Sequence, residues 1–172
     1  MMQNVKHQTG TDASSKTDFA NENSFNAQSI TFKALDGYEL NGTLYSPTHP
    51  STAKIVLASA TGVPQAFYRR FSEYATQLGY EVLTFDYRGI GKSAPRHLKG
   101  FQMSYLDWGK LDLAGAIDYL YDEHAPLFLV GHSYGGQALG LTPNHQKITA
   151  MYCFGTGAGW HGYMPFKEKI KV

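Results

Sequence analysis

The chain has 172 residues, of which 42% are hydrophobic and 14% aromatic, and its formal net charge is +1. This composition suits one domain with a substantial core, and the low charge without a basic cluster argues against a nucleic-acid partner. No apolar stretch approaches 18 residues, so no transmembrane helix is expected. The single cysteine, Cys153, excludes an internal disulfide, and its apolar neighbours predict a buried strand residue.

The N-terminal segment differs in composition from the rest. Residues 1–26 are polar and lack the apolar segment of a secretory signal, so we expect a disordered tail. By default this predicts a cytoplasmic protein. Residues 27–172 are then expected to form one incomplete domain.

The predicted strands and helices alternate along the chain. Apolar or alternating runs predict strands over Ser29–Ala34, Glu39–Tyr45, Lys54–Ala58, Glu81–Phe85, Leu127–Val130 and Lys147–Phe154. Helical spacing of apolar residues predicts helices over Ala66–Leu78 and from about Ser104 to Tyr121. Asp36-Gly37 is typical of a hairpin turn between the first two strands. The fold class is therefore α/β, an open and mostly parallel sheet with helices on both faces.

Gly131-His132-Ser133-Tyr134-Gly135 is the most informative segment. It reads G-x-S-x-G, follows an apolar strand and precedes a short helix that must end before Pro143. In this nucleophile elbow the strand turns into a helix within one residue, which strains the serine backbone and exposes its hydroxyl. The alternative is a glycine-rich turn with a solvated serine.

Two segments, in the order and position expected of one family, carry a resemblance. Residues 86–93, DYRGIGKS, are similar to a D-x-R-G-x-G-x-S segment after the fourth strand, and residues 131–136, GHSYGG, to a G-H-S-x-G-G elbow. From about Ser29 to Pro165 the chain resembles the N-terminal part of an alpha/beta-hydrolase. In its details the sequence resembles a bacterial subset of this family, near the serine-aminopeptidase and monoglyceride-lipase-like hydrolases.

The resemblance implies a serine hydrolase that forms an acyl-enzyme on Ser133. Its substrate would be a small ester, such as an esterase cleaves, or a thioester or amide. No cofactor and no metal are expected.

The oxyanion formed in that reaction needs two backbone N–H donors. The first is expected from Tyr134, the residue after the nucleophile. The second is expected from the loop after the third strand, where the family usually carries His-Gly and this chain has Thr61-Gly62. We place this donor at Val63, with Gly62 or Thr61 as alternatives. The other interpretation is that residues 60–65 form only a turn.

Three further polar residues lie near these segments. Asp86 and Arg88 follow a strand at the site end of the sheet, but the resemblance implies that they order the loop rather than react. His132 stands beside the nucleophile, yet its side chain is expected to project to the opposite side of the elbow and to pack there.

The partners that would activate Ser133 are missing. After Ser133 the sequence holds two histidines, His145 and His161, and one carboxylate, Glu168. In this fold the acid precedes the histidine, so the order of His161 and Glu168 is reversed. We therefore predict a truncated alpha/beta-hydrolase, ending after about the sixth strand and weak or inactive as it stands. The best candidate for a rescuing base is His161, because it follows the last predicted strand at the site end of the sheet.

The last predicted strand would lie uncovered at the edge of the sheet. An exposed apolar edge favours pairing with another strand, so dimerisation through this edge is plausible. The alternative to a hydrolase is accordingly a noncatalytic fragment or pseudoenzyme that acts as a binding module.

Overall fold

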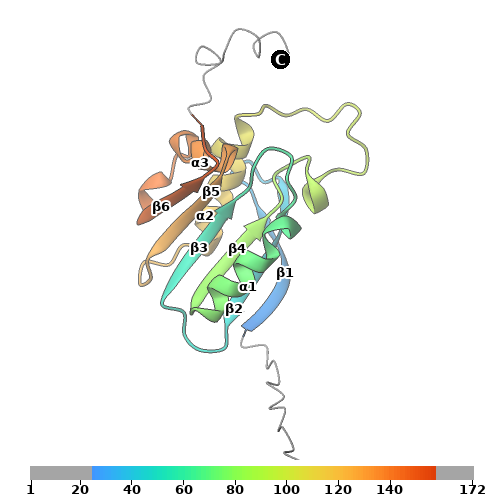
Figure 1. Ribbon diagram of the computed structural model, residues 1–172. Helices are drawn as coiled ribbons and strands as arrows, with labels where there is room; N and C mark the ends of the chain where they lie inside the picture. The colour runs from blue at the N-terminus through green and yellow to red at the C-terminus, as the bar shows by residue number, and fades with distance from the viewer. Residues whose placement is uncertain (1–24, 158–172) are drawn as a thin grey trace, which may run out of the picture.

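One six-stranded sheet forms the centre of the molecule, as the computed structural model in Figure 1 shows for residues 25–157, the part of the chain that it describes. The strands are β1 (Phe25–Lys33), β2 (Glu39–Pro47), β3 (Ala53–Ala58), β4 (Tyr80–Phe85), β5 (Leu127–His132) and β6 (Ala150–Phe154). Their order across the sheet is β1-β2-β4-β3-β5-β6. The β1–β2 and β2–β4 pairs are antiparallel and the remaining pairs are parallel, which confirms the predicted fold class.

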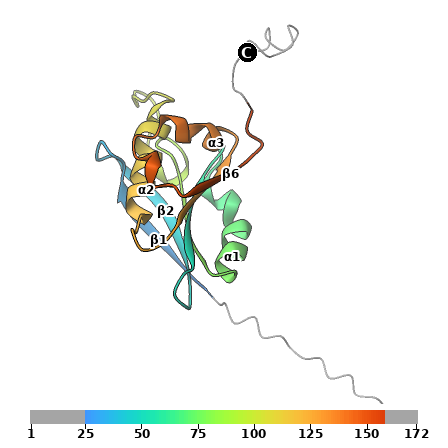
Figure 2. The same cartoon turned by 90° about the vertical axis from the view of Figure 1, so that its left-hand side faces the viewer.

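Helices cover both faces of the sheet (Figure 2). On one face lies α1 (Arg69–Gln77), which continues from the 3-10 turn η1 (Gln65–Tyr68). On the other lie α2 (Ala114–Leu120), preceded by the π-helical segment η3 (Trp108–Leu113), and α3 (Tyr134–Ala138). Short 3-10 turns complete the described chain: η2 (Gly91–Ser93), η4 (Leu139–Leu141) and η5 (His145–Lys147).

The second predicted helix begins later than expected. The Asp107 carboxylate accepts a hydrogen bond from the Ser104 N–H at 2.7 Å, and the segment between them forms a turn. Regular helical structure therefore starts near Trp108.

The larger part of the core lies between the sheet and α2 and α3. Its fully buried side chains come from both layers and include Leu40, Val56, Leu83, Phe85, Leu113, Ile117 and Leu129. A smaller cluster lies on the α1 side, formed by Tyr45, Ile55, Ala75, Val82 and Val130. Burial on both faces explains why the central strands β3 and β4 have continuous apolar sequences.

The outward face of α1 is aromatic. Phe67, Phe71, Tyr74 and Leu78, here called the α1 stripe, are 68%, 41%, 63% and 57% exposed. The helix packs on the sheet through small residues instead: Ser72, Ala75 and Thr76 are buried. The two hydroxyls are satisfied by carbonyls four residues back. The helix was predicted correctly, but the apolar spacing does not mark its buried face.

β6 lies at one edge of the sheet, and on the α1 side Figure 1 shows no helix over β3, β5 and β6. Within residues 25–157 its only strand partner is β5. Tyr152 is 67% exposed, and the exposed apolar edge predicted for this strand is present. Cys153 lies in the strand as predicted, but it is exposed rather than buried. Its thiol donates to the Gly136 carbonyl of α3 at 3.9 Å, and among the described residues no further strand pairs with the outer side of β6.

The first strand begins inside the segment expected as a tail. Phe25 and Asn26 belong to β1 and pair with Pro47 and Ser46 of β2. The ring of Phe25 packs against Tyr45, with ring centroids 6.4 Å apart. This contact with the α1-side cluster extends the folded domain two residues beyond the predicted boundary.

Candidate active site

Ser133 occupies the turn between β5 and α3. Its backbone has φ 50° and ψ −112°, and it is the one non-glycine residue with positive φ among residues 25–157. An L-residue in this region is strained, and such strain gathers at functional sites. The predicted strand-to-helix turn at the serine is confirmed.

The tightness of the turn requires glycine beside it. A Cβ atom on Gly131 would lie 2.6 Å from both the Cα and the nitrogen of Gly136, closer than real Cβ contacts come. Gly131 also pairs with Ala58, the last residue of β3. The elbow therefore emerges beside the start of residues 60–65, which follow β3 and are here called the β3 loop.

Backbone hydrogen bonds fix the serine. The Ser133 N–H donates to the Phe154 carbonyl at 3.0 Å, and the Ser133 carbonyl accepts from the Gly136 N–H at 3.0 Å and from the Thr156 hydroxyl at 3.2 Å. Ser133 itself is half-buried. Within the described residues its side-chain oxygen has no recorded hydrogen bond, so no general base contacts it there.

The predicted second oxyanion donor is only partly available. The Val63 N–H donates to the Ala60 carbonyl at 3.1 Å and closes a turn. The alternatives Thr61 and Gly62 are exposed, and Gly62 has φ 72°. No hydrogen bond is recorded from either amide within residues 25–157. Gly62 and Thr61 thus present freer donors than Val63.

The predicted first oxyanion donor lies at the start of α3. Tyr134 is the first residue of this helix, so its N–H has no acceptor within the helix. Its hydroxyl donates to the Tyr105 carbonyl at 2.9 Å, and the two rings pack with centroids 4.5 Å apart. The Tyr105 hydroxyl is hydrogen-bonded to that of Thr61. Tyr105 therefore contacts both segments that carry candidate donors.

Asp86 orders the β3 loop, the role predicted for it. Its buried carboxylate accepts from the Gln65 N–H at 2.8 Å, the Gln65 side-chain amide at 3.1 Å and the Lys92 N–H at 2.9 Å. These bonds tie the end of that loop to the segment after β4. All three use the carboxylate as an acceptor, which leaves it poorly suited to act on Ser133.

Arg88 is also structural. Its guanidinium bonds both carboxylate oxygens of Asp36 at 2.8 and 2.9 Å, and its Nε donates to Asp112 at 2.8 Å. The Arg88 carbonyl accepts from the Trp108 indole at 2.9 Å. Hydrogen bonding to Arg88 lowers the pKa of Asp36. Burial raises the pKa of Asp112, and its bonds from Arg88 oppose that rise.

His132 packs on the α1 side of the sheet. Its ring stacks on Phe154 with centroids 4.5 Å apart, and its Nδ1 lies 2.9 Å from the Tyr68 hydroxyl. The packing role predicted for this histidine is thus supported by its contacts. The roles of Tyr68 and Gln65 in organising the β3 loop were missed because the partners of these residues lie far away in the sequence.

The remaining candidate bases do not meet Ser133 in the described structure. His145 lies in η5, before β6, and its Nδ1–H donates to the Thr142 carbonyl at 3.0 Å. Because β5 and β6 are parallel, His145 lies at the end of these strands opposite to Ser133, which follows β5. His161 and Glu168 lie outside the described residues.

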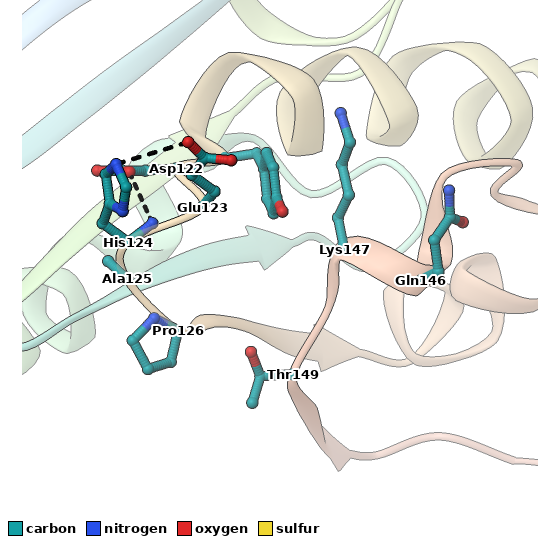
Figure 3. Close-up of a pocket in the computed structure, with 9 residues that line it drawn as sticks. Asp122, Glu123, His124, Ala125, Pro126, Gln146, Lys147 and Thr149 are labelled. Carbon is teal, nitrogen blue, oxygen red and sulfur yellow. Dashed lines mark hydrogen bonds and ion pairs between the residues drawn. The ribbon is translucent and has the colours of Figure 1, made fainter.

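A cavity of about 380 Å³ also lies at that opposite end (Figure 3). It is lined by Tyr121, Asp122, Glu123, His124, Ala125, Pro126, Gln146, Lys147 and Thr149. Residues 121–126 directly precede β5, whereas Ser133 directly follows it. Because β5 has six residues, the cavity and Ser133 lie about 20 Å apart along the strand. This cavity is therefore separate from the candidate active site.

A serine at a strained turn after a central parallel strand, beside a glycine-containing loop at the same sheet edge, defines the alpha/beta-hydrolase class. The comparison with family models agrees. The chain belongs to the serine aminopeptidase, S33, family, whose model matches residues 49–171. Within residues 25–157, no helix has the length and apolarity needed to cross a membrane.

One curated relative is a lipase. A monoglyceride lipase from Saccharomyces cerevisiae is 26% identical over 113 residues, which cover 62% of this chain and 36% of the lipase. The chain thus spans about a third of the length of this curated relative.

Solved structures share the fold. A thermostable carboxyl esterase from Bacillus coagulans, in complex with glycerol, has a TM-score of 0.63 at 18% identity, with 76% of this chain and 44% of that chain covered. An esterase from Pyrococcus furiosus has a TM-score of 0.62 at 18% identity, with 99% and 66% covered. At these identities the likeness establishes the fold.

Proposed function

We propose that this chain carries the nucleophile and the oxyanion hole of a serine hydrolase that acts on a small-molecule ester, thioester or amide. Ser133 attacks the carbonyl carbon and forms an acyl-enzyme. The Tyr134 N–H and an N–H of the β3 loop, from Gly62, Thr61 or Val63, stabilise the oxyanion. The family and its lipase relative support the reaction class. A cytoplasmic location belongs to the same proposal.

The backbone of Ser133 is the observation that carries this proposal. Strain at a single non-glycine residue, held by Phe154 and Thr156, has no evident value for stability. It does place a hydroxyl beside the N-terminal amides of α3, where a developing negative charge is stabilised.

As it stands, the chain is proposed to be a weak hydrolase. A serine hydroxyl without a base is a poor nucleophile, and in the described part of the chain no histidine contacts Ser133. The elbow and the oxyanion donors alone leave residual catalysis.

Turnover of p-nitrophenyl butyrate by the purified chain and by Ser133→Ala tests the proposal. We expect a slow rate, well below the ~10 s⁻¹ of a typical enzyme, that Ser133→Ala abolishes and that added imidazole raises. A fluorophosphonate probe should label the chain slowly, as expected of a serine without a base, and should not label Ser133→Ala. Equal labelling of both proteins would overturn the assignment of the nucleophile.

The exposed β6 edge favours a second candidate function, binding to another protein strand. Dimerisation through this edge is the simplest form. Light scattering should then show a dimer that Tyr152→Lys converts to a monomer, because an edge lysine opposes strand pairing. Leu98→Lys, at an exposed apolar residue of the β4–α2 loop, is the control. A monomeric parent chain would remove this candidate.

A further inference from the structure

Tyr68 lies between the two segments that carry the candidate oxyanion donors. It is the last residue of η1 and is only 4% exposed. Its hydroxyl oxygen accepts the Ala60 N–H at 2.9 Å, at the start of the β3 loop. The same hydroxyl lies 2.9 Å from Nδ1 of His132, the residue before the nucleophile. One side chain therefore joins the β3 loop to the elbow.

The Tyr68 phenol has a single hydrogen to donate in these two bonds. The Ala60 amide can only donate, so the phenol oxygen is its acceptor. The bond between the phenol and His132 Nδ1 can have either group as its donor, depending on the histidine tautomer. We assign the phenol hydrogen to this bond, which makes Nδ1 the acceptor and places the hydrogen of the imidazole on Nε2. Burial raises the pKa of Tyr68, so the phenol keeps the hydrogen that this bond needs.

The partner histidine is itself held in place. The His132 ring stacks on Phe154 and meets the Tyr68 ring edge-on, with centroids 4.5 and 5.9 Å apart. Phe154 also accepts the hydrogen bond of the Ser133 N–H. Tyr68, His132 and Phe154 thus connect the β3 loop to the backbone of the nucleophile on the α1 side.

We propose that Tyr68 is a positioning residue of the oxyanion hole: its hydroxyl fixes the distance between the β3 loop and the elbow, and so the spacing of the two N–H donors. This inference rests on the proposed function. Tyr68 touches neither the substrate nor the reacting atoms. Its removal should weaken stabilisation of the oxyanion while the nucleophile stays reactive toward other chemistry.

The test uses a nucleophile that needs no base. In the full chain, Ser133→Cys is combined with Cys153→Ala, so that one thiol remains. Acylation of this thiol by p-nitrophenyl acetate forms a C–S bond, releases p-nitrophenolate and passes through an oxyanion. Alkylation by iodoacetamide displaces iodide without forming one. The ratio of the two rate constants therefore measures the oxyanion hole, and differences in thiolate reactivity cancel.

Tyr68→Phe removes the hydroxyl and keeps the ring. We expect it to lower the ratio by about tenfold, less than the loss of a whole oxyanion donor, which costs about 10²–10³. Tyr74→Phe is the matched control, because it makes the same change on the exposed face of the adjoining helix, and its ratio should be unchanged. In ¹⁵N spectra, His132 should show an unprotonated Nδ1 in the parent and a mixture of tautomers in Tyr68→Phe.

The possible outcomes separate the two proposals. If the parent ratio equals that of a free thiol such as N-acetylcysteine methyl ester, no oxyanion hole exists and both proposals fail. If the parent exceeds the free thiol but Tyr68→Phe leaves the ratio and the His132 tautomer unchanged, only the role of Tyr68 is refuted. A fall of both rate constants by the same factor would also refute it, because that indicates a general loss of structure.

Discussion

Gly135 of α3 and Ala58 of β3 approach each other so closely that a Cβ atom on Gly135 would lie 2.0 Å from the Ala58 carbonyl oxygen. The obstacle is backbone, which cannot rotate away as a side chain would. We expect Gly135→Ala to lower the free energy of unfolding by about 3 kcal/mol or more, at the upper end of overpacking costs. Urea denaturation followed by circular dichroism measures this.

Gly140→Ala is the matched control for that substitution. Gly140 lies in η4, and a Cβ atom there would meet nothing within 4 Å. It should leave stability unchanged or raise it by about 0.4–1 kcal/mol, since alanine restricts the unfolded chain. Equal losses from both substitutions would show that the close packing at Gly135 is not the cause.

The strained backbone of Ser133 predicts a conflict between stability and function. Glycine adopts positive φ without steric cost, whereas alanine keeps the Cβ of serine. Ser133→Gly should therefore unfold with a free energy about 1 kcal/mol higher than Ser133→Ala, the released strain being partly offset by the entropy of glycine. Both variants lack the hydroxyl, so a comparison of their denaturation midpoints isolates the backbone. A less stable Ser133→Gly would contradict the strain.

Arg88 should be far more important for stability than an exposed cation. Removing it leaves the carboxylate of Asp112, which is 0% exposed, without its partner. We expect Arg88→Ala to cost about 3–5 kcal/mol in the free energy of unfolding. Lys33→Ala, which breaks an exposed pair with Glu39, should cost less than about 1 kcal/mol. Similar losses in thermal melts would argue against a special role for Arg88.

The Asp36–Arg88 pair predicts a pH dependence. Hydrogen bonding to Arg88 lowers the pKa of Asp36 below 3.8 in the folded state. The unfolded chain then binds the proton first on acidification, so this contribution is complete above about pH 4 and is lost as the pH falls through the folded pKa. Burial raises the pKa of Asp112, so the contribution of Asp112 to stability changes with pH in the opposite direction.

Asp36→Asn separates these two effects. The difference in melting temperature between the parent and Asp36→Asn should shrink steadily from pH 5 to below pH 3. The Asp112 contribution is present in both proteins and cancels in that difference except for the part that the charge of Asp36 adds to the pKa of Asp112. A difference that stays constant with pH would show that Asp36 does not stabilise the fold through its charge.

Local sequence patterns predicted the strands of the sheet, the order of strands and helices along the chain, and the turn at Ser133. Each of these features depends on residues that are close together in the sequence. The partners that connect these elements were not predictable in this way. Tyr68 and His132 are 64 residues apart, and Asp36 and Arg88 are 52 apart. The periodicity of apolar residues also located α1, but it did not show which face of the helix is buried against the sheet. Ser72 and Thr76 can lie on the buried face because their hydroxyls are hydrogen-bonded within the helix.

The α1 stripe affects how the folding of this chain can be followed. Dyes such as 1-anilinonaphthalene-8-sulfonate fluoresce on exposed apolar surface and are commonly taken to report loosened, molten states. Phe67, Phe71, Tyr74 and Leu78 offer such a surface in the folded protein. A bright dye signal is therefore compatible with a fully ordered native state, and near-ultraviolet circular dichroism is the safer criterion of tertiary packing.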